Sequence, residues 1–301
     1  MTKVVYQEQF LSYEEQINLL KNRGLLFKDE ARALNLFECI SYYRFSSYWH
    51  PFLKDKQVKI FKENVNFDSI FDLYKFDADL RKIIMAEIVK IEIAVRSKMV
   101  YILSLSNDSF WLENEKLFSC SNIYASLISS IKKEIDRSEE SFIISFKKEF
   151  SNDIPPAFMV LETASFGTLS KLYKYLKSSK EKQEIALFFG LLDKAFESWL
   201  HSLVYVRNIC AHHSRLWNRE MRISPLHPRT YKNQWLENKQ IPNNRIYFIL
   251  SIIIYLLNII NPKHSFKQKL NSLFLKYPSI DKAAMGFPTD WQKEPLWNGN
   301  P

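Results

Sequence analysis

Glycine is scarce in this chain, whose 301 residues include only five. Tight hairpin turns use glycine more than most other residues, so a fold built from many strands joined by hairpins is disfavoured. Long stretches rich in Leu, Ile, Lys, Glu and Phe fill the intervals between the glycines. Together these features predict an all-α protein whose helices are joined by polar loops.

Cysteine is also rare. Cys39, Cys120 and Cys210 are odd in number and far apart, and no CxxC pair occurs. This pattern argues against a disulfide framework and a zinc site, and it favours a reducing cytoplasm. The polar N-terminal segment lacks the pattern of a signal peptide. We therefore expect a cytoplasmic protein that uses no metal and no other cofactor.

No apolar run is long enough to cross a membrane easily. The most apolar segment, residues 246–260 (IYFILSIIIYLLNII), carries no charge. As a helix it would span about 22 Å, whereas a bilayer requires roughly 20 apolar residues. A buried core helix is therefore preferred over a membrane segment, and no membrane partner is expected.

Charge is unbalanced toward the basic side, with 42 Lys and Arg, 33 Asp and Glu, and a net charge of +9. Between Arg207 and Arg245, eight Lys or Arg residues are accompanied only by Glu220 and Glu237. Such a balance fits a polyanionic partner such as nucleic acid or an anionic membrane surface. The alternative is a lysine-rich surface that has no such partner.

The spacing of apolar residues predicts a long helix from about residue 68 to 104, with Asp68 as its N-cap. Charged residues also recur along this helix, and the simplest interpretation is a solvated face with spaced ion pairs. These residues are Asp77, Arg81, Glu87, Glu92 and Arg96.

The remaining segments also read mainly as helices. Residues 54–65 are expected to form a short charged loop or a weak hairpin, and no linker is long enough to force two domains. We expect one domain over residues 1–301, with N-terminal helices to about 66, a helical core over about 67–262, and a tail over about 263–301 that wraps back onto the body. Further helices are predicted over residues 14–23, 28–40, within 121–150, on both sides of a turn at 165–167, and from Lys194 to about Trp217.

The helix that ends near Trp217 carries the most distinctive polar residues. Arg207 falls within its apolar stripe, where arginine is rarely buried without a partner, so it should meet an anion, a partner subunit or a solvent-filled cleft. Asn208 and His212 are four residues apart and share a neighbouring face, and Arg215 continues that row. His212 and His213 point to different sides of a helix, so a shared metal ion is not expected.

Arginine and histidine together can cleave RNA without a metal, because RNA carries its own nucleophile in the 2′-hydroxyl. A histidine can transfer a proton near neutral pH, and an arginine can hold the phosphate and stabilise its added charge. The products would be a 2′,3′-cyclic phosphate and a 5′-hydroxyl. The alternative is a helix end whose His and Arg side chains cap carbonyls or bind a surface anion.

Several blocks along the chain resemble the Abi-like family of bacterial abortive-infection proteins, of the AbiD and AbiF type. That family resembles a branch of the HEPN superfamily, helical bundles whose ribonucleases carry an arginine–asparagine–histidine motif. The blocks are YYRFSSYW (residues 42–49), FDLYKFDADLR (71–81), IEIAVR (91–96), PPAFMVLETASFGTLSKLY (155–173), RNICAHHSRLWNR (207–219) and GFPTDWQKEPLW (286–297).

The resemblance implies a HEPN-like helical bundle that cleaves RNA during phage defence. Arg207 and His212 match the catalytic pair of HEPN ribonucleases, and Asn208 matches the polar residue that follows the arginine. HEPN proteins commonly dimerise and place two motifs at a shared cleft, so a homodimer is expected. An active ribonuclease would harm its host, which implies restraint by an antitoxin, a small RNA or an inactive assembly.

Two further groups are candidates for RNA binding. Tyr43 and Arg44, with Tyr48 and Trp49, could stack on or clamp RNA; alternatively, the aromatic rings belong to the core and Arg44 pairs with a carboxylate such as Glu162. A second set beside the motif could contact phosphates or simply be solvated charges at a helix end. That set comprises His213, Arg215 and Arg219.

Two other functions compete with the ribonuclease. A noncatalytic HEPN-like protein would bind RNA, including a structured small RNA, and leave it intact. A membrane-acting toxin would use residues 246–260, although that segment is short.

Overall fold

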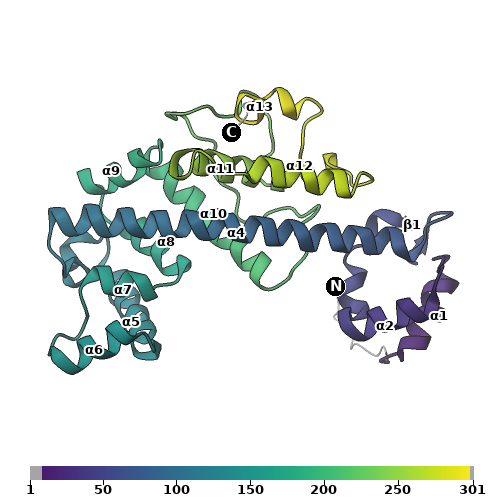
Figure 1. Ribbon diagram of the computed structural model, residues 1–301, viewed down its shortest axis with the longest axis horizontal. Coiled ribbons are helices and arrows are strands. Elements are labelled where there is room, and N and C mark those ends of the chain that lie inside the picture. The colour runs from purple at the N-terminus through teal and green to yellow at the C-terminus, as the bar shows by residue number, and fades with distance from the viewer. Residues whose placement is uncertain (1–8, 299–301) are drawn as a thin grey trace, which may run out of the picture. The chain divides into compact units, whose positions relative to one another are not determined.

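The computed structural model describes residues 9–298, in which thirteen α-helices and one short β-hairpin are formed (Figure 1). The predicted all-α class is confirmed. The helices are α1 (Tyr13–Asn22), α2 (Glu30–Ile40), α3 (Tyr42–Ser46), α4 (Phe67–Ser106), α5 (Ser121–Arg137), α6 (Ser141–Glu149), α7 (Ala157–Thr163), α8 (Phe166–Tyr175), α9 (Lys180–Phe188), α10 (Asp193–Ala211), α11 (Ile246–Ile260), α12 (Phe266–Lys276) and α13 (Pro295–Asn298). Strands β1 (Leu53–Asp55) and β2 (Ile60–Phe61) pair antiparallel, so residues 54–65 contain the weak hairpin rather than only a loop.

The chain packs into two compact units. Among the described residues, unit 1 contains residues 9–80 together with Leu273–Ile280, and unit 2 contains Arg81–Ser272 and residues 281–298. The division falls inside α4 and not near residue 66. Whether the two units fold as one domain, as the sequence predicts, stays a prediction.

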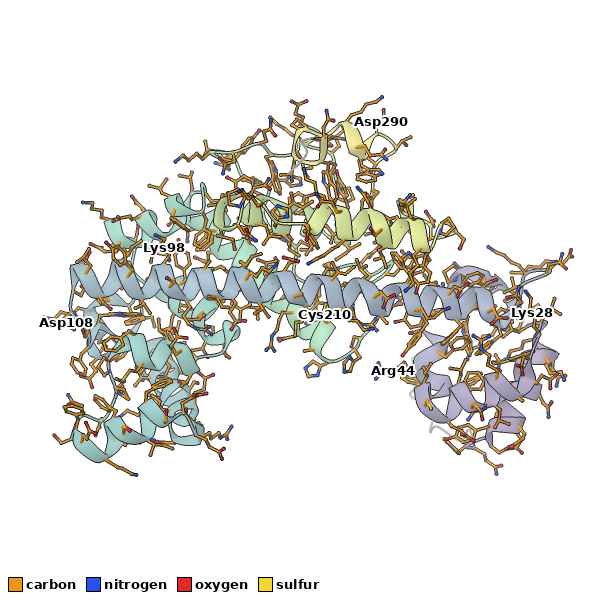
Figure 2. All side chains as sticks on the ribbon, in the orientation of Figure 1. Lys28, Arg44, Lys98, Asp108, Cys210 and Asp290 are labelled. Atoms are coloured by element: carbon orange, nitrogen blue, oxygen red, sulfur yellow. The ribbon has the colours of Figure 1, made fainter. Side chains whose placement is uncertain are left out.

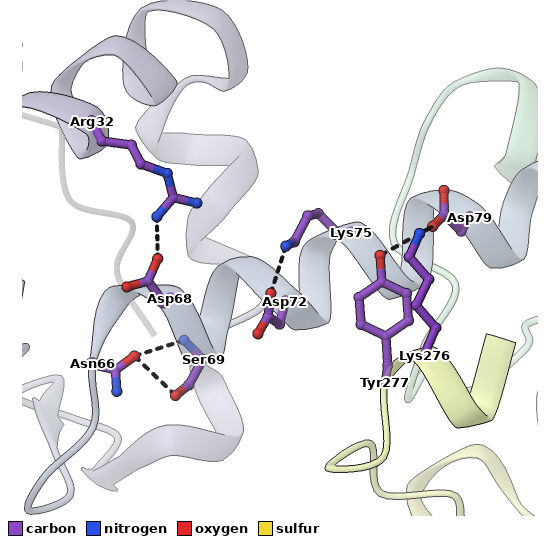
Figure 3. Close-up of polar contacts among 9 residues, drawn as sticks. All are labelled: Arg32, Asn66, Asp68, Ser69, Asp72, Lys75, Asp79, Lys276 and Tyr277. Carbon is purple, nitrogen blue, oxygen red and sulfur yellow. Dashed lines mark hydrogen bonds and ion pairs between the residues drawn. The ribbon is translucent and has the colours of Figure 1, made fainter. Parts of the chain in front are cut away.

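In unit 1, the start of α4 is fixed by Asn66 and not by Asp68. The Asn66 Oδ1 atom accepts a hydrogen bond from the Ser69 backbone N–H (2.9 Å) and lies 3.1 Å from the Ser69 hydroxyl (Figure 3). Asp68 lies in the first turn and forms an ion pair with Arg32 of α2. The prediction of Asp68 as the N-cap was therefore wrong by two residues, because Asn66 supplies the capping oxygen.

The aromatic segment after α2 builds the core of unit 1. Tyr48 and Trp49 are only 1% and 6% exposed, and the Tyr48 hydroxyl donates to the fully buried Asp77 carboxylate (2.7 Å). Tyr48 and Trp49 therefore pack inside the protein, which excludes them as a surface on which RNA bases stack. The alternative interpretation of these two rings as core is confirmed.

Unit 2 is built around α11. Its residues from Ile246 to Leu257 are all buried, and this confirms the predicted core helix. In Figure 1, α9 and α11 lie on one side of α4, and α5, α6 and α7 lie on the other. Over residues 9–298, we find no helix with the length and apolar character needed to cross a bilayer.

The C-terminal tail wraps onto α11, as predicted. Trp297 stacks on Tyr247 with ring centroids 5.2 Å apart, and its indole N–H donates to the Ser251 hydroxyl (3.0 Å). Trp291 packs edge-on against Trp297. These large rings stabilise the tail because each removes a wide apolar surface from water.

The charged residues of α4 do not form the solvated face that their spacing suggested. Asp77, Arg81 and Glu87 are buried, and the Arg96 side chain is only 12% exposed. Arg96 pairs with Glu92 (3.0 Å) and also donates to the backbone carbonyl of Ala164 (3.0 Å). The prediction failed because the spacing within α4 does not reveal the additional partners that lie far away in the sequence, such as Ala164 for Arg96 and Lys269 for Glu87.

Glu87 is the clearest case of a buried charged residue on α4. Its side chain is fully buried, and its two carboxylate oxygens lie 2.6 Å from Lys90 Nζ and 2.7 Å from Lys269 Nζ. Burial alone would raise the pKa of the Glu87 carboxyl, but the hydrogen bonds and charges of Lys269 and Lys90 together outweigh burial and lower the pKa. The carboxylate therefore joins α12 to α4 while it remains ionised.

We expect Glu87→Gln to lower the free energy of unfolding at pH 7 by about 1–3 kcal/mol, the usual cost of losing charged hydrogen bonds. Because the pKa of Glu87 is lower in the folded state, its contribution is complete above the usual value of 4.5 and is lost as the pH falls through the folded value. Urea unfolding at pH 7 and pH 3 checks this. A difference between wild type and variant that does not shrink in acid would contradict it.

Candidate active site

The motif formed by Arg207, Asn208 and His212 lies at the C-terminal end of α10, in unit 2. The helix buries one face, which includes Trp199, Leu203 and Val206. It ends at Ala211, with His212 as the C-cap, and so stops six residues before the predicted end at Trp217. Cys210, labelled in Figure 2, marks this last turn.

The end of α10 is closed by two backbone hydrogen bonds. The His213 N–H donates to the Cys210 carbonyl (3.1 Å), and the Ser214 N–H donates to the Ile209 carbonyl (3.0 Å). This is the Schellman arrangement, in which the residue after the cap adopts a left-handed conformation that glycine favours. Here that residue is His213, with φ 54°. Histidine tolerates this region better than most residues, but the conformation is still strained.

His213→Val and His213→Gly should differ in stability although both remove the imidazole. A β-branched side chain is strongly disfavoured at positive φ, whereas glycine is relaxed there. We expect the valine variant to be about 1–2 kcal/mol less stable than the glycine variant, the approximate cost of the left-handed conformation. Thermal unfolding of the pair measures this difference, and equal melting temperatures would show that the local backbone rearranges.

The three motif side chains are accessible. Asn208 and His212 are exposed, and Arg207 is half-buried. At about 100° per residue, Arg207 points between the buried Leu200 and Leu203, so it follows the apolar stripe of α10 while part of its side chain reaches solvent. Within the part of the chain that the structure describes, none of these three side chains makes a hydrogen bond or an ion pair. They are therefore available to a ligand or to a second protein chain.

Arg207 and His212 leave α10 in different directions. They are five residues apart, and at about 100° per residue their side chains leave the helix axis about 140° apart. Asn208 and His212 are closer in direction, about 40° apart. The structure therefore brings the motif residues to one end of α10 without joining them into a hydrogen-bonded cluster.

The segment after α10 is firmly held, although it is not helical. The Arg81 guanidinium lies 3.4 Å from the Ser214 carbonyl, Leu216 and Trp217 are buried, and the Trp217 indole N–H donates to the Asp281 carbonyl (3.3 Å). Arg81, which belongs to α4, thus helps to hold the chain that follows the C-terminal end of α10. The sequence did not predict that Arg81 contacts this segment. The available signal was the presence of a charged residue among the apolar residues of a long helix.

The other predicted RNA-binding residues lie in different settings. Arg215 and Arg219 are half-buried in the loop after α10, where the Arg219 guanidinium donates to the Arg215 carbonyl (2.9 Å). Arg215 therefore does not continue a helical row. In unit 1, Tyr43 is 88% exposed on α3, beside Arg44. The predicted pairing of Arg44 with Glu162 would join residues of the two units and stays a prediction.

Across residues 9–298, no group of three or more His, Cys, Asp or Glu side chains is arranged to hold a metal ion.

Comparison with known proteins identifies one family. The family model for "Abi-like protein" matches residues 35–218, which is more than half of the chain and includes the whole segment from Arg207 to Trp217. Searches of curated proteins and of solved structures gave no match.

Proposed function

The chain belongs to the Abi-like protein family, and from this premise we propose that it is a metal-independent endoribonuclease that acts in abortive infection. The observation that carries the proposal is the end of α10, where Arg207, Asn208 and His212 are accessible and have no partner among the described residues. All three lie inside the segment matched by the family model.

The chemistry follows from the side-chain types. His212 would act on a proton of the 2′-hydroxyl or of the leaving 5′-oxygen, since imidazole exchanges protons near neutral pH. Arg207 would hold the scissile phosphate and stabilise the charge that develops as the 2′-oxygen attacks. Asn208 would orient the phosphate. The 2′-oxygen–phosphorus bond forms as the bond to the 5′-oxygen breaks, which leaves a 2′,3′-cyclic phosphate and a 5′-hydroxyl.

The diverging directions of Arg207 and His212 support a site shared by two chains. In a two-fold symmetric dimer, the same surface of each chain meets its copy, so Arg207 of one protomer can approach His212 of the other. The homodimer therefore belongs to the proposal. An antitoxin or a regulatory small RNA that restrains the activity also belongs to it.

Incubation of the purified protein with end-labelled RNA in EDTA tests the activity, beside an Arg207→Ala/His212→Ala double variant. Cleavage by the unmodified protein alone, with a cyclic phosphate end, supports the proposal, and a DNA strand of the same sequence should remain intact. RNA that is bound but not cleaved would favour the noncatalytic RNA-binding function instead.

A further inference from the structure

A second polar site lies in unit 2, in a cavity of about 570 Å³ between α8 and α10. This volume is within the range of ordinary ligand pockets. Its α8 wall presents Gly167, Ser170, Lys171 and Lys174, which recur at the three- and four-residue spacing of one helix face. We call this cavity the α8–α10 groove.

The groove has a defined shape. A Cβ atom on Gly167 would lie 3.9 Å from Val204 Cγ1, so the two helices lie close together at this end. One rim is formed by Leu226, whose backbone is held at two points. Its N–H bonds to the Ser198 hydroxyl (2.9 Å), and its carbonyl accepts from the Trp199 indole N–H (2.9 Å).

The charge of the groove is mainly positive. Lys171, Lys174 and Lys194 are exposed along its walls. Glu197 is the acidic residue among the lining side chains, and it lies 3.6 Å from the buried Lys182 Nζ and 3.9 Å from Lys194 Nζ. Because Lys182 offsets the Glu197 charge, the three exposed lysines leave a net positive surface suited to phosphate groups.

One exposed face of α10 runs from the groove, which ends at His201 and Val204 on this helix, toward Asn208 and His212. At about 100° per residue, Lys194, His201, Asn208 and His212 lie within about 40° of a single line along the helix. All four are exposed. From His201 to His212 the distance along the axis is about 16 Å. A nucleic-acid strand that reaches the motif on this face would therefore extend into the groove.

We propose that the α8–α10 groove binds the phosphate groups of a single RNA strand on one side of the bond to be cleaved. The inference rests on the proposed ribonuclease function and adds the path of the substrate. Lysine binds phosphate as a point charge and reads no base, so the groove contributes affinity and register but no sequence preference.

The test uses the Arg207→Ala/His212→Ala protein, so that RNA remains intact during binding. Its affinity for a fluorescent single-stranded RNA is measured by anisotropy over a range of salt concentrations, with and without Lys171→Ala, Lys174→Ala and Lys194→Ala together. Each phosphate contact contributes about 0.7 to the slope of log affinity against log salt concentration for single strands. Loss of three should therefore lower this slope by about 2 and weaken binding about fiftyfold at physiological salt.

The matched control removes three exposed lysines of unit 2 that lie outside the groove. This control changes the net charge equally and should bind RNA nearly as well as the Arg207→Ala/His212→Ala protein. Single-stranded DNA of the same sequence should bind through the groove with an affinity similar to that of RNA. The control substitutions are Lys133→Ala, Lys148→Ala and Lys263→Ala.

Equal binding by the groove and control variants would overturn the inference, as would failure of the Arg207→Ala/His212→Ala protein to bind RNA. Cleavage is measured in parallel with Arg207 and His212 intact. Cleavage that is unaffected by the groove substitutions would leave the ribonuclease proposal standing without the groove. Groove-dependent binding without any cleavage would leave the groove standing without the ribonuclease.

Discussion

Arg207→Ala and His212→Ala should each abolish RNA cleavage and leave the fold intact. Loss of a general acid or base usually costs about 10²–10⁴ in rate, and loss of a group that stabilises the transition state costs about 10²–10³. The fold should survive because neither side chain is buried or makes a hydrogen bond or ion pair with any described residue. Single-turnover cleavage rates and melting temperatures measure the two effects separately.

The controls remove the same side-chain types from other exposed positions. Arg137→Ala at the end of α5 and His50→Ala in unit 1 should cleave RNA at the rate of the unmodified protein. Rates within a few-fold of the unmodified protein for both Arg207→Ala and His212→Ala would remove the motif from the mechanism.

Mixing the two inactive variants tests whether the site is shared between chains. If Arg207 of one protomer acts with His212 of its partner, half of the re-associated dimers are mixed, and each has one intact site. Two-fold symmetry then predicts recovery of about a quarter of the unmodified activity. A site contained within one chain would recover none. Denaturation and joint refolding of equal amounts, followed by the cleavage assay, distinguishes these outcomes.

The largest expected effect on stability belongs to Trp199→Ala. Trp199 is fully buried on α10, with its ring 4.8 Å from Trp235 and 5.4 Å from Tyr255, measured between centroids. Its indole N–H donates to the Leu226 carbonyl (2.9 Å). We expect a loss of about 3–5 kcal/mol in the free energy of unfolding, because a large cavity forms in a packed core.

Trp199→Phe separates packing from hydrogen bonding, since it keeps an aromatic ring but leaves the Leu226 carbonyl without its indole donor. It should be less damaging than alanine, with a cost of about 1–3 kcal/mol. Leu275→Ala, at a position that is 80% exposed, should be nearly neutral. Chemical unfolding curves give the three values, and similar losses for Trp199→Ala and Leu275→Ala would contradict the buried role of Trp199.

The sequence by itself determined the helical class, most helix positions and the residues of the candidate site. Helices could be predicted because their apolar spacing is a local property, as in the uninterrupted run of α11 and the buried face of α10. The same holds for the tail, whose tryptophans are too apolar to remain in water. Arg207, Asn208 and His212 could be selected because their side-chain chemistry is distinctive and their spacing is short.

Tertiary structure alone decided which charges are buried and where α10 ends. Glu87 reads as a surface residue in its own helix, and its burial depends on Lys269, 182 positions away, as well as on its helix neighbour Lys90. The end of α10 had no glycine to mark it, because His213 adopts the left-handed conformation instead. The α8–α10 groove joins lysines from separate helices. Such features depend on contacts between distant residues, and local sequence patterns do not contain that information.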